Sequence, residues 1–130
     1  MNFSVLMSIY KNEKVEFFTR CMESIWNEQT IKPNEIILVI DGPLYDGLYE
    51  SIGIWQDNLG EVLRIIPLES NVGLGDALNI GLTHCTNELV ARMDTDDIAL
   101  PERFEKQLAI FESKDIDVCG SWVSEFNKEE

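Results

Sequence analysis

The chain of 130 residues is strongly acidic, with 24 Asp and Glu against 10 Lys and Arg and a formal net charge of −14. This balance argues against non-specific binding to nucleic acid or to an anionic membrane surface, because both need a basic face. Hydrophobic residues make up 45% of the chain and charged residues 26%, which is typical of a globular domain with a real core. The length predicts one domain over residues 1–130.

The cysteines and the apolar runs indicate the compartment. Cys21, Cys85 and Cys119 are odd in number and far apart, and each lies in an apolar segment. We therefore expect buried free thiols in a reducing compartment. No apolar run reaches the ~18 residues of a membrane span, and no basic segment precedes the first apolar run, so we expect neither a transmembrane helix nor a signal peptide. These features favour a cytoplasmic protein.

Strand-like and helix-like patterns alternate along the chain. In chain order, the predicted elements are a strand (3–10), a helix (14–29), a strand (35–41), a helix (48–59), a strand (62–69), a helix (75–85), a strand (88–94), a helix (101–113) and a strand (116–123). Pro67 suggests that the third strand is an edge strand or ends there. Alternation with short connections predicts an α/β domain whose mostly parallel sheet is covered by helices on both faces.

Polar residues collect where the predicted strands end. Tyr10 ends the first strand, Asp41 the second, and Asn71 follows the third. The fourth strand runs into Asp94-Thr95-Asp96-Asp97. Because open parallel sheets bind ligands beyond the carboxyl ends of their strands, we expect these side chains to share one edge.

The acidic turn at residues 94–97 has two interpretations. Three carboxylates in four residues repel one another unless a cation lies among them. The turn is either a solvated start to the helix at 101, with Asp97 near the helix dipole, or a site for Mg²⁺ or Mn²⁺, which prefer oxygen ligands. Its place directly after a buried strand favours the metal. Ile98 and Ala99 break an EF-hand pattern, and His84, the single histidine, supports no zinc cluster.

The glycines of residues 71–81 do not form a known phosphate-binding motif by themselves. Gly73 and Gly75 lack the third glycine of the dinucleotide fingerprint and the Gly-Lys-Ser/Thr of a P-loop. They are interpreted either as a tight start to a helix or as a place where backbone amides contact a substrate.

Four segments carry a resemblance to a known family: SVLMSIYKNE, NEIILVIDGP, NVGLGDALNIGL and ELVARMDTDDIALPERFEKQ. In this order they resemble the N-terminal, nucleotide-sugar-binding half of family 2 glycosyltransferases of GT-A fold, particularly the branch that builds bacterial polysaccharides. The match spans residues 3–108, and the last segment is the most specific. The resemblance implies transfer of a sugar from a nucleoside diphosphate, with UDP favoured, to an acceptor hydroxyl with inversion at the anomeric carbon. It also implies a Mn²⁺ or Mg²⁺ cofactor that neutralises charge on the departing diphosphate.

The resemblance assigns donor-binding roles to single positions. Tyr10 would stack on the nucleotide base, and Asp41 would accept from uracil N3–H at the edge of that base. Asp96 would bind the metal directly. Asp94 would bind the metal's water shell or the ribose.

Three further positions carry implied roles in donor binding. Asn79 lies in the third matched segment, next to Leu78, where the family frequently has an arginine. Arg92 stands where it either pairs with phosphate in place of that arginine or forms a salt bridge with an acidic neighbour. Asp97 would orient the sugar.

The resemblance places the catalytic base outside the chain. In the family this Asp or Glu lies well downstream of Asp-x-Asp, in the acceptor half. We therefore expect it beyond residue 130, with residues 1–130 forming a donor-binding domain truncated before that half. Such a chain should bind nucleotide, transfer sugar poorly or not at all, and self-associate through an uncovered face or edge as a homo-oligomer.

The implied partners follow from the same resemblance. The donor would be a nucleoside diphosphate sugar, and the acceptor a glycan, lipid-linked or protein-linked. The inner face of the membrane is a candidate location for this cytoplasmic domain. The alternative is a non-catalytic module for nucleotide-sugar binding or assembly.

Two other enzyme classes also place aspartates after parallel strands. Haloacid-dehalogenase-like phosphotransferases need Asp-x-Asp-x-Thr/Val after the first strand, where this sequence reads IYKNE. Response-regulator receivers need an acidic pair there and an aspartate after the third strand, where Lys11 and Glu69 stand instead. Neither pattern is met.

Overall fold

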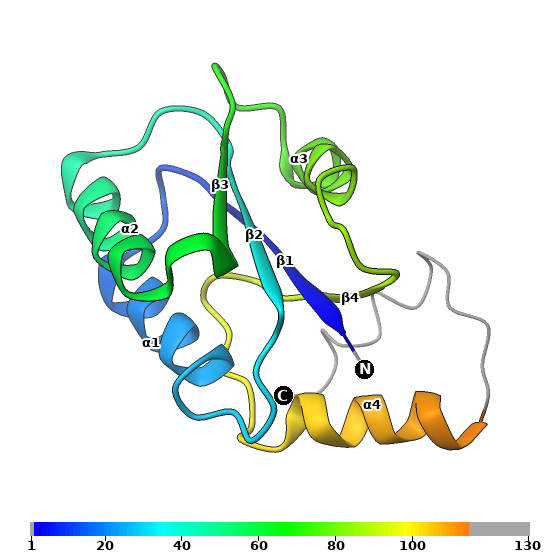
Figure 1. The fold of residues 1–130 in the computed structure, drawn as a ribbon. Helices are drawn as coiled ribbons and strands as arrows, with labels where there is room; N and C mark the ends of the chain where they lie inside the picture. The colour runs from blue at the N-terminus through cyan, green and yellow to red at the C-terminus, as the bar shows by residue number, and fades with distance from the viewer. Residues whose placement is uncertain (1, 115–130) are drawn as a thin grey trace.

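Parallel strands form the centre of the molecule, and helices cover both faces of the sheet (Figure 1). The computed structural model describes residues 2–114. Its elements are β1 (Phe3–Ile9), α1 (Val15–Ile25), β2 (Glu35–Ile40), α2 (Asp46–Leu59), the 3₁₀ turn η1 (Gly60–Val62), β3 (Leu63–Pro67), α3 (Leu74–Leu82), β4 (Leu89–Arg92) and α4 (Arg103–Lys114). The α/β prediction is confirmed, and each predicted element before residue 114 is present with its ends shifted by a few residues. The predicted strand at 116–123 and Cys119 lie outside the described residues.

The strand order creates a switch point in the sheet. The order is β3-β2-β1-β4, and every pairing among the described strands is parallel. The chain adds β2 and then β3 on one side of β1, and it crosses back to place β4 on the other side. The strand order thus changes direction between β1 and β4, and open parallel sheets bind ligands at the carboxyl edge beside such a point. As predicted, β3 lies at an edge of this sheet, with Pro67 as its last residue.

Two apolar layers form because alternate residues of each strand point to opposite faces. The larger layer packs β1, β2 and β4 against α1, α2 and α4, and Phe18 and Phe104 are fully buried there. The smaller layer packs Leu6, Val39 and Val90 against α3. Figure 1 shows α1 and α2 on one side of the sheet and α3 on the other. Since both faces of β2 are covered, all of its residues are buried.

Helix α3 lies very close to the sheet because of a glycine. A Cβ atom at Gly81 would stand 2.6 Å from both Leu6 Cδ1 and Val39 Cγ2, which is closer than carbon atoms pack. The absence of a side chain thus lets the helix settle on β1 and β2. This packing fixes the start of α3, at Gly73 and Leu74, near the carboxyl edge of the sheet.

A buried carboxylate fastens the opposite, amino edge. Glu35, which is 7% exposed, accepts hydrogen bonds from Ser4 Oγ at 2.7 Å, Arg64 Nη1 at 3.0 Å and Thr86 N at 2.8 Å. Burial raises the pKa of Glu35, but the hydrogen bonds from Thr86, Ser4 and Arg64 together outweigh it and leave the pKa below its usual range. This network ties β1, β2, β3 and the segment before β4 together.

The thiols and the helices bear on two further predictions. Cys21 is a buried free thiol, as expected, whereas Cys85 is also free but only half-buried. Burial, followed by the negative charge of Glu35, raises the pKa of Cys85 to about 12. None of the helices in the described part of the chain is long and apolar enough to span a membrane.

Candidate functional site

A pocket of about 400 Å³ opens at the carboxyl edge of the sheet. This volume lies within the usual range for small-molecule sites. It is lined by the end of β1, the loops that follow the four strands and the start of α3: Ser8, Tyr10, Glu13, Asp41, Asn71, Gly73, Leu74, Asp94, Thr95 and Asp96. The polar edge expected from the sequence is therefore a single pocket at the switch point.

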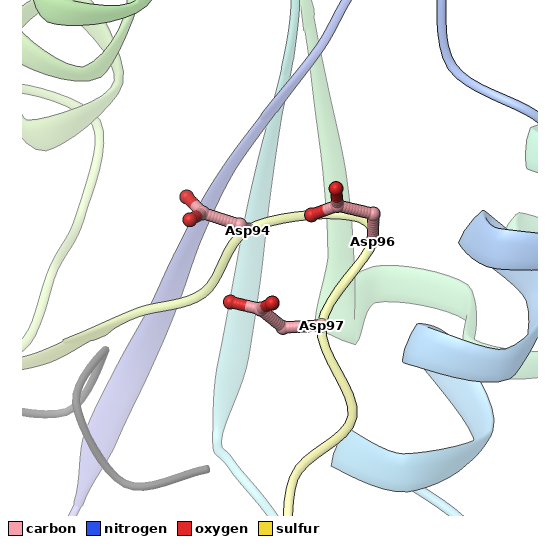
Figure 2. A group of neighbouring side chains, drawn as sticks. All are labelled: Asp94, Asp96 and Asp97. Carbon is pink, nitrogen blue, oxygen red and sulfur yellow. The ribbon is translucent and has the colours of Figure 1, made fainter.

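The acidic turn, residues 94–97, brings three carboxylates together. Asp94, Asp96 and Asp97 each offer an oxygen atom, and these atoms lie within 4.8 Å of one another. Figure 2 shows the three carboxylates on the same side of the turn. The turn is closed by a hydrogen bond from Asp97 N to Asp94 O at 3.1 Å. Because α4 begins only at Arg103, Asp97 lies outside its first turn, which weakens the interpretation as a helix cap.

Buried polar groups of α1 and of the segment that follows it bond to the acidic turn and to the segment that leads from the turn into α4. Cys21 Sγ donates to Asp94 O at 3.4 Å. Gln29, which is 3% exposed, donates to Leu100 O at 2.7 Å and accepts from Phe104 N at 3.3 Å. Burial first, and then the nearby carboxylates, raise the pKa of the Cys21 thiol far above its usual range, so it stays protonated and can donate. The turn therefore rests on a fixed support.

Asp41 is occupied by the loop between β3 and α3. Its carboxylate accepts from Val72 N at 2.7 Å, from Gly73 N at 3.2 Å and from Asn71 Nδ2 at 3.2 Å. Gly42 has φ +89°, and a Cβ there would lie 2.7 Å from Asn71 N, so only glycine lets the two loops meet. A carboxylate has about four acceptor positions. Asp41 thus clamps the loop and keeps about one position for a ligand.

The other predicted site residues take different places. Tyr10 lines the pocket and is 47% exposed. Asn79 is exposed on α3, and Arg92 Nη2 lies 3.7 Å from Asp94 Oδ1 in a salt bridge. Neither Asn79 nor Arg92, nor Asp97, is among the described residues that line the pocket. Their roles in donor binding stay predictions.

Several lining residues received no ligand-binding role from the sequence. Ser8 lines the pocket from the end of strand β1, and Leu74 from the start of α3. Glu13 and Thr95 line it from the loops after β1 and β4. For Glu13 and Thr95 the signal in the sequence was their position after predicted strands, because no motif singles them out.

Fold and pocket together define the class of protein: an α/β domain with a ligand site at the switch point of a parallel sheet, as in nucleotide-binding proteins. The sequence model of glycosyl transferase family 2 matches residues 4–130. The chain belongs to this family. The resemblance found in the sequence is confirmed.

Individual relatives agree with this assignment. The chain is 50% identical over 127 residues to the amylovoran biosynthesis glycosyltransferase AmsE of Erwinia amylovora, covering 97% of this chain and 47% of that protein. It is 39% identical over 125 residues to the UDP-Gal:alpha-D-GlcNAc-diphosphoundecaprenol beta-1,3-galactosyltransferase of Escherichia coli, with coverages of 95% and 44%. The chain spans about half the length of these curated relatives.

A solved structure shares the fold and carries a ligand. S. aureus TarS 1-349 in complex with UDP-GlcNAc matches with a TM-score of 0.75 and 25% identity, covering 88% of this chain and 32% of that one. The GT-A fold predicted from the sequence is therefore confirmed.

Proposed function

We propose that this chain is the donor-binding half of an inverting, metal-dependent glycosyltransferase that uses a UDP-sugar in polysaccharide biosynthesis. One observation carries the proposal. Asp94 and Asp96 line the same pocket as Tyr10 and Asp41, so groups suited to a metal-bound diphosphate and groups suited to a base face one ligand.

The donor set of the acidic turn fits Mn²⁺ or Mg²⁺. Both cations take hard oxygen ligands and keep positions for water and phosphate. Asp94 and Asp96 would hold the cation, with Asp97 close enough to orient the sugar, since the three carboxylates converge within 4.8 Å. When bound, the cation supplies electrostatic stabilisation of the diphosphate leaving group. Without a cation the same three charges repel one another.

The rest of the pocket suits a nucleoside. The half-exposed ring of Tyr10 offers a face on which a base can stack. The remaining acceptor position of Asp41 is suited to a donor such as uracil N3–H. The UDP-GlcNAc bound by TarS and the UDP-Gal named for the galactosyltransferase support UDP as the nucleotide.

The acceptor and the base complete the proposal. The diphosphoundecaprenol in the galactosyltransferase's name supports a lipid-linked acceptor at the inner face of the membrane. A carboxylate must still remove the proton of the acceptor hydroxyl, and no residue of the described pocket is assigned that role. We place this base in the acceptor half.

Thermal unfolding with UDP and Mn²⁺, together and separately, tests the proposal. A ligand at a hundred times its Kd stabilises a protein by about 2.7 kcal/mol, which raises the Tm of a domain of this size by several degrees. We expect the shift to be largest with both ligands together, and the gain that Mn²⁺ adds to the UDP shift to vanish in Asp96→Ala.

A matched control removes a carboxylate elsewhere. Asp57 is exposed on α2 and does not line the pocket, so Asp57→Ala should keep the full shift. GDP with Mn²⁺ serves as the second nucleotide and should give a smaller shift. If neither nucleoside diphosphate shifts the Tm of the folded chain, the proposed function is wrong.

A further inference from the structure

Glu13 joins the loop after β1 to the acidic turn after β4. Its carboxylate accepts from Thr95 Oγ1 through one oxygen and from Lys14 N at 2.9 Å through the other. Its own N–H donates to Tyr10 O at 3.0 Å, and its carbonyl accepts from Tyr45 Oη at 2.8 Å. One residue thus contacts the nucleoside side of the pocket, the start of α2 and the acidic turn.

Thr95 is the member of the acidic turn that faces inward. It is 6% exposed, whereas Asp96 is exposed. A buried hydroxyl needs a partner, and a carboxylate is a strong one because the hydrogen bond is charge-assisted. Since Thr95 stands between Asp94 and Asp96 in the chain, fixing its side chain also fixes the direction in which both neighbouring carboxylates leave the backbone.

We propose that Glu13 and Thr95 are positioning residues that hold the acidic turn ready for a divalent cation. This inference rests on the proposed function. The repulsion among Asp94, Asp96 and Asp97 favours opening of the turn when no cation is bound. The hydrogen bond from Thr95 to Glu13 opposes that opening, so the cation does not have to order the turn when it binds. Both carboxylate oxygens of Glu13 accept from protein donors, so the carboxylate is held in a fixed orientation toward the acidic turn.

Two probes separate a positioning role from general support of the fold. Mn²⁺ alone reports on the acidic turn and is measured from the electron paramagnetic resonance signal of the free ion. Uridine alone reports on the nucleoside side, because it has no phosphate to contact a metal, and is measured by calorimetry. Both are titrated into the 130-residue chain at a temperature where every variant is folded.

Thr95→Val keeps the size of the buried side chain and removes its hydroxyl. Loss of a group that orients metal ligands costs roughly 10- to 100-fold in metal affinity, and we expect a weakening of Mn²⁺ binding in that range. The Kd for uridine should not change. Thr95→Ser keeps the hydroxyl and should restore Mn²⁺ binding. Glu13→Ala should weaken Mn²⁺ binding by a similar factor and add little to Thr95→Val, because both changes break one hydrogen bond.

Thr86→Val is the matched control. Thr86 Oγ1 also bonds a carboxylate, that of Glu35 at 3.2 Å, but at the opposite edge of the sheet. It should lower stability and leave both Kd values unchanged.

The outcomes divide cleanly. If Thr95→Val weakens the binding of Mn²⁺ and of uridine equally, the role of Thr95 is merely structural. If Mn²⁺ binding is unchanged, Thr95 has no role in it. Either result overturns the inference, as does a wild-type chain that binds no Mn²⁺. A wild-type chain that binds Mn²⁺ in a Thr95-dependent way but gives no Tm shift with UDP would support the positioning role and overturn only the UDP-dependent function.

Discussion

Asp41 offers a direct test of whether a predicted ligand-binding residue also builds the pocket. Asp41 is 4% exposed, and its carboxylate accepts from two backbone amides, those of Val72 and Gly73, and from the side chain of Asn71. Asp41→Asn keeps the size of the side chain but replaces one acceptor oxygen by an NH₂ donor. Without any ligand present, we expect this variant to be less stable.

The size of the effect follows from the bonds. If the new amide oxygen faces Val72 N, the NH₂ group faces the N–H of Gly73 and the Nδ2 of Asn71, so two of the three bonds to the side chain are lost. Hydrogen bonds to charged groups contribute roughly 1.5–3 kcal/mol each. The exposed Asn71 side chain can turn to water and therefore adds little. We expect a loss of about 2–3 kcal/mol, or about 10 °C in Tm at roughly 3–5 °C per kcal/mol.

Urea and thermal unfolding of the ligand-free chain measure this loss. Asn71→Ala is the control, because it removes one neutral donor and leaves the two backbone bonds of Asp41 intact; it should cost about 1 kcal/mol or less. An Asp41→Asn variant as stable as the wild type would refute the clamp and leave Asp41 with a ligand-binding role alone.

Two further predictions concern packing and pH. Gly81→Ala forces a methyl group against side chains of β1 and β2 at 2.6 Å and should destabilise the protein by about 1–2 kcal/mol in urea unfolding. The control, Gly75→Ala in the same helix, meets no atom within 4 Å and should be neutral or stabilising. Equal effects of the two substitutions would contradict the close packing of α3. The pKa of Glu35 is lowered in the folded chain. The stabilisation that the ionised Glu35 provides is therefore fully present above its ordinary pKa of 4.5 and is lost as the pH falls through its pKa in the folded state. The stability gap between wild type and Glu35→Gln should therefore be about 1–2 kcal/mol at neutral pH and shrink below pH 4.5; a gap that stays constant would argue against the ionised network.

The fold could be predicted because burial on two faces leaves a simple pattern. All residues of β2, Glu35–Ile40, are buried, so after Glu35 the strand appears as a continuous apolar run. The end of α1 was harder to predict, since the helix stops at Ile25 and not at residue 29. Gln29 explains the difference: its amide donates to Leu100 O and to Ser24 O. A polar side chain with a distant partner has no periodic signature.

The candidate site likewise contains features that could be predicted from the sequence and features that could not. The acidic turn could be found from the sequence because its carboxylates are neighbours in the chain. The clamp at Asp41 and the link between Glu13 and Thr95 could not, because their partners lie 30 to 32 and 82 residues away. Short spacing predicts which groups meet, whereas long-range hydrogen bonds depend on the strand order.

The two edges of the sheet use carboxylates for different purposes. At the amino edge, Glu35 is surrounded by donors from three segments, and its lowered pKa shows that the folded chain already satisfies the ionised form. At the carboxyl edge, the acidic turn gathers three carboxylates whose oxygens lie within 4.8 Å of one another, and the guanidinium of Arg92 lies 3.7 Å from Asp94. A cation would add nothing to the hydrogen-bonded Glu35, whereas it would reduce the repulsion among the carboxylates of the acidic turn. The sheet thus keeps its satisfied carboxylate where the fold needs stability and its crowded ones where the pocket opens, and this contrast makes the acidic turn the place to look for the metal.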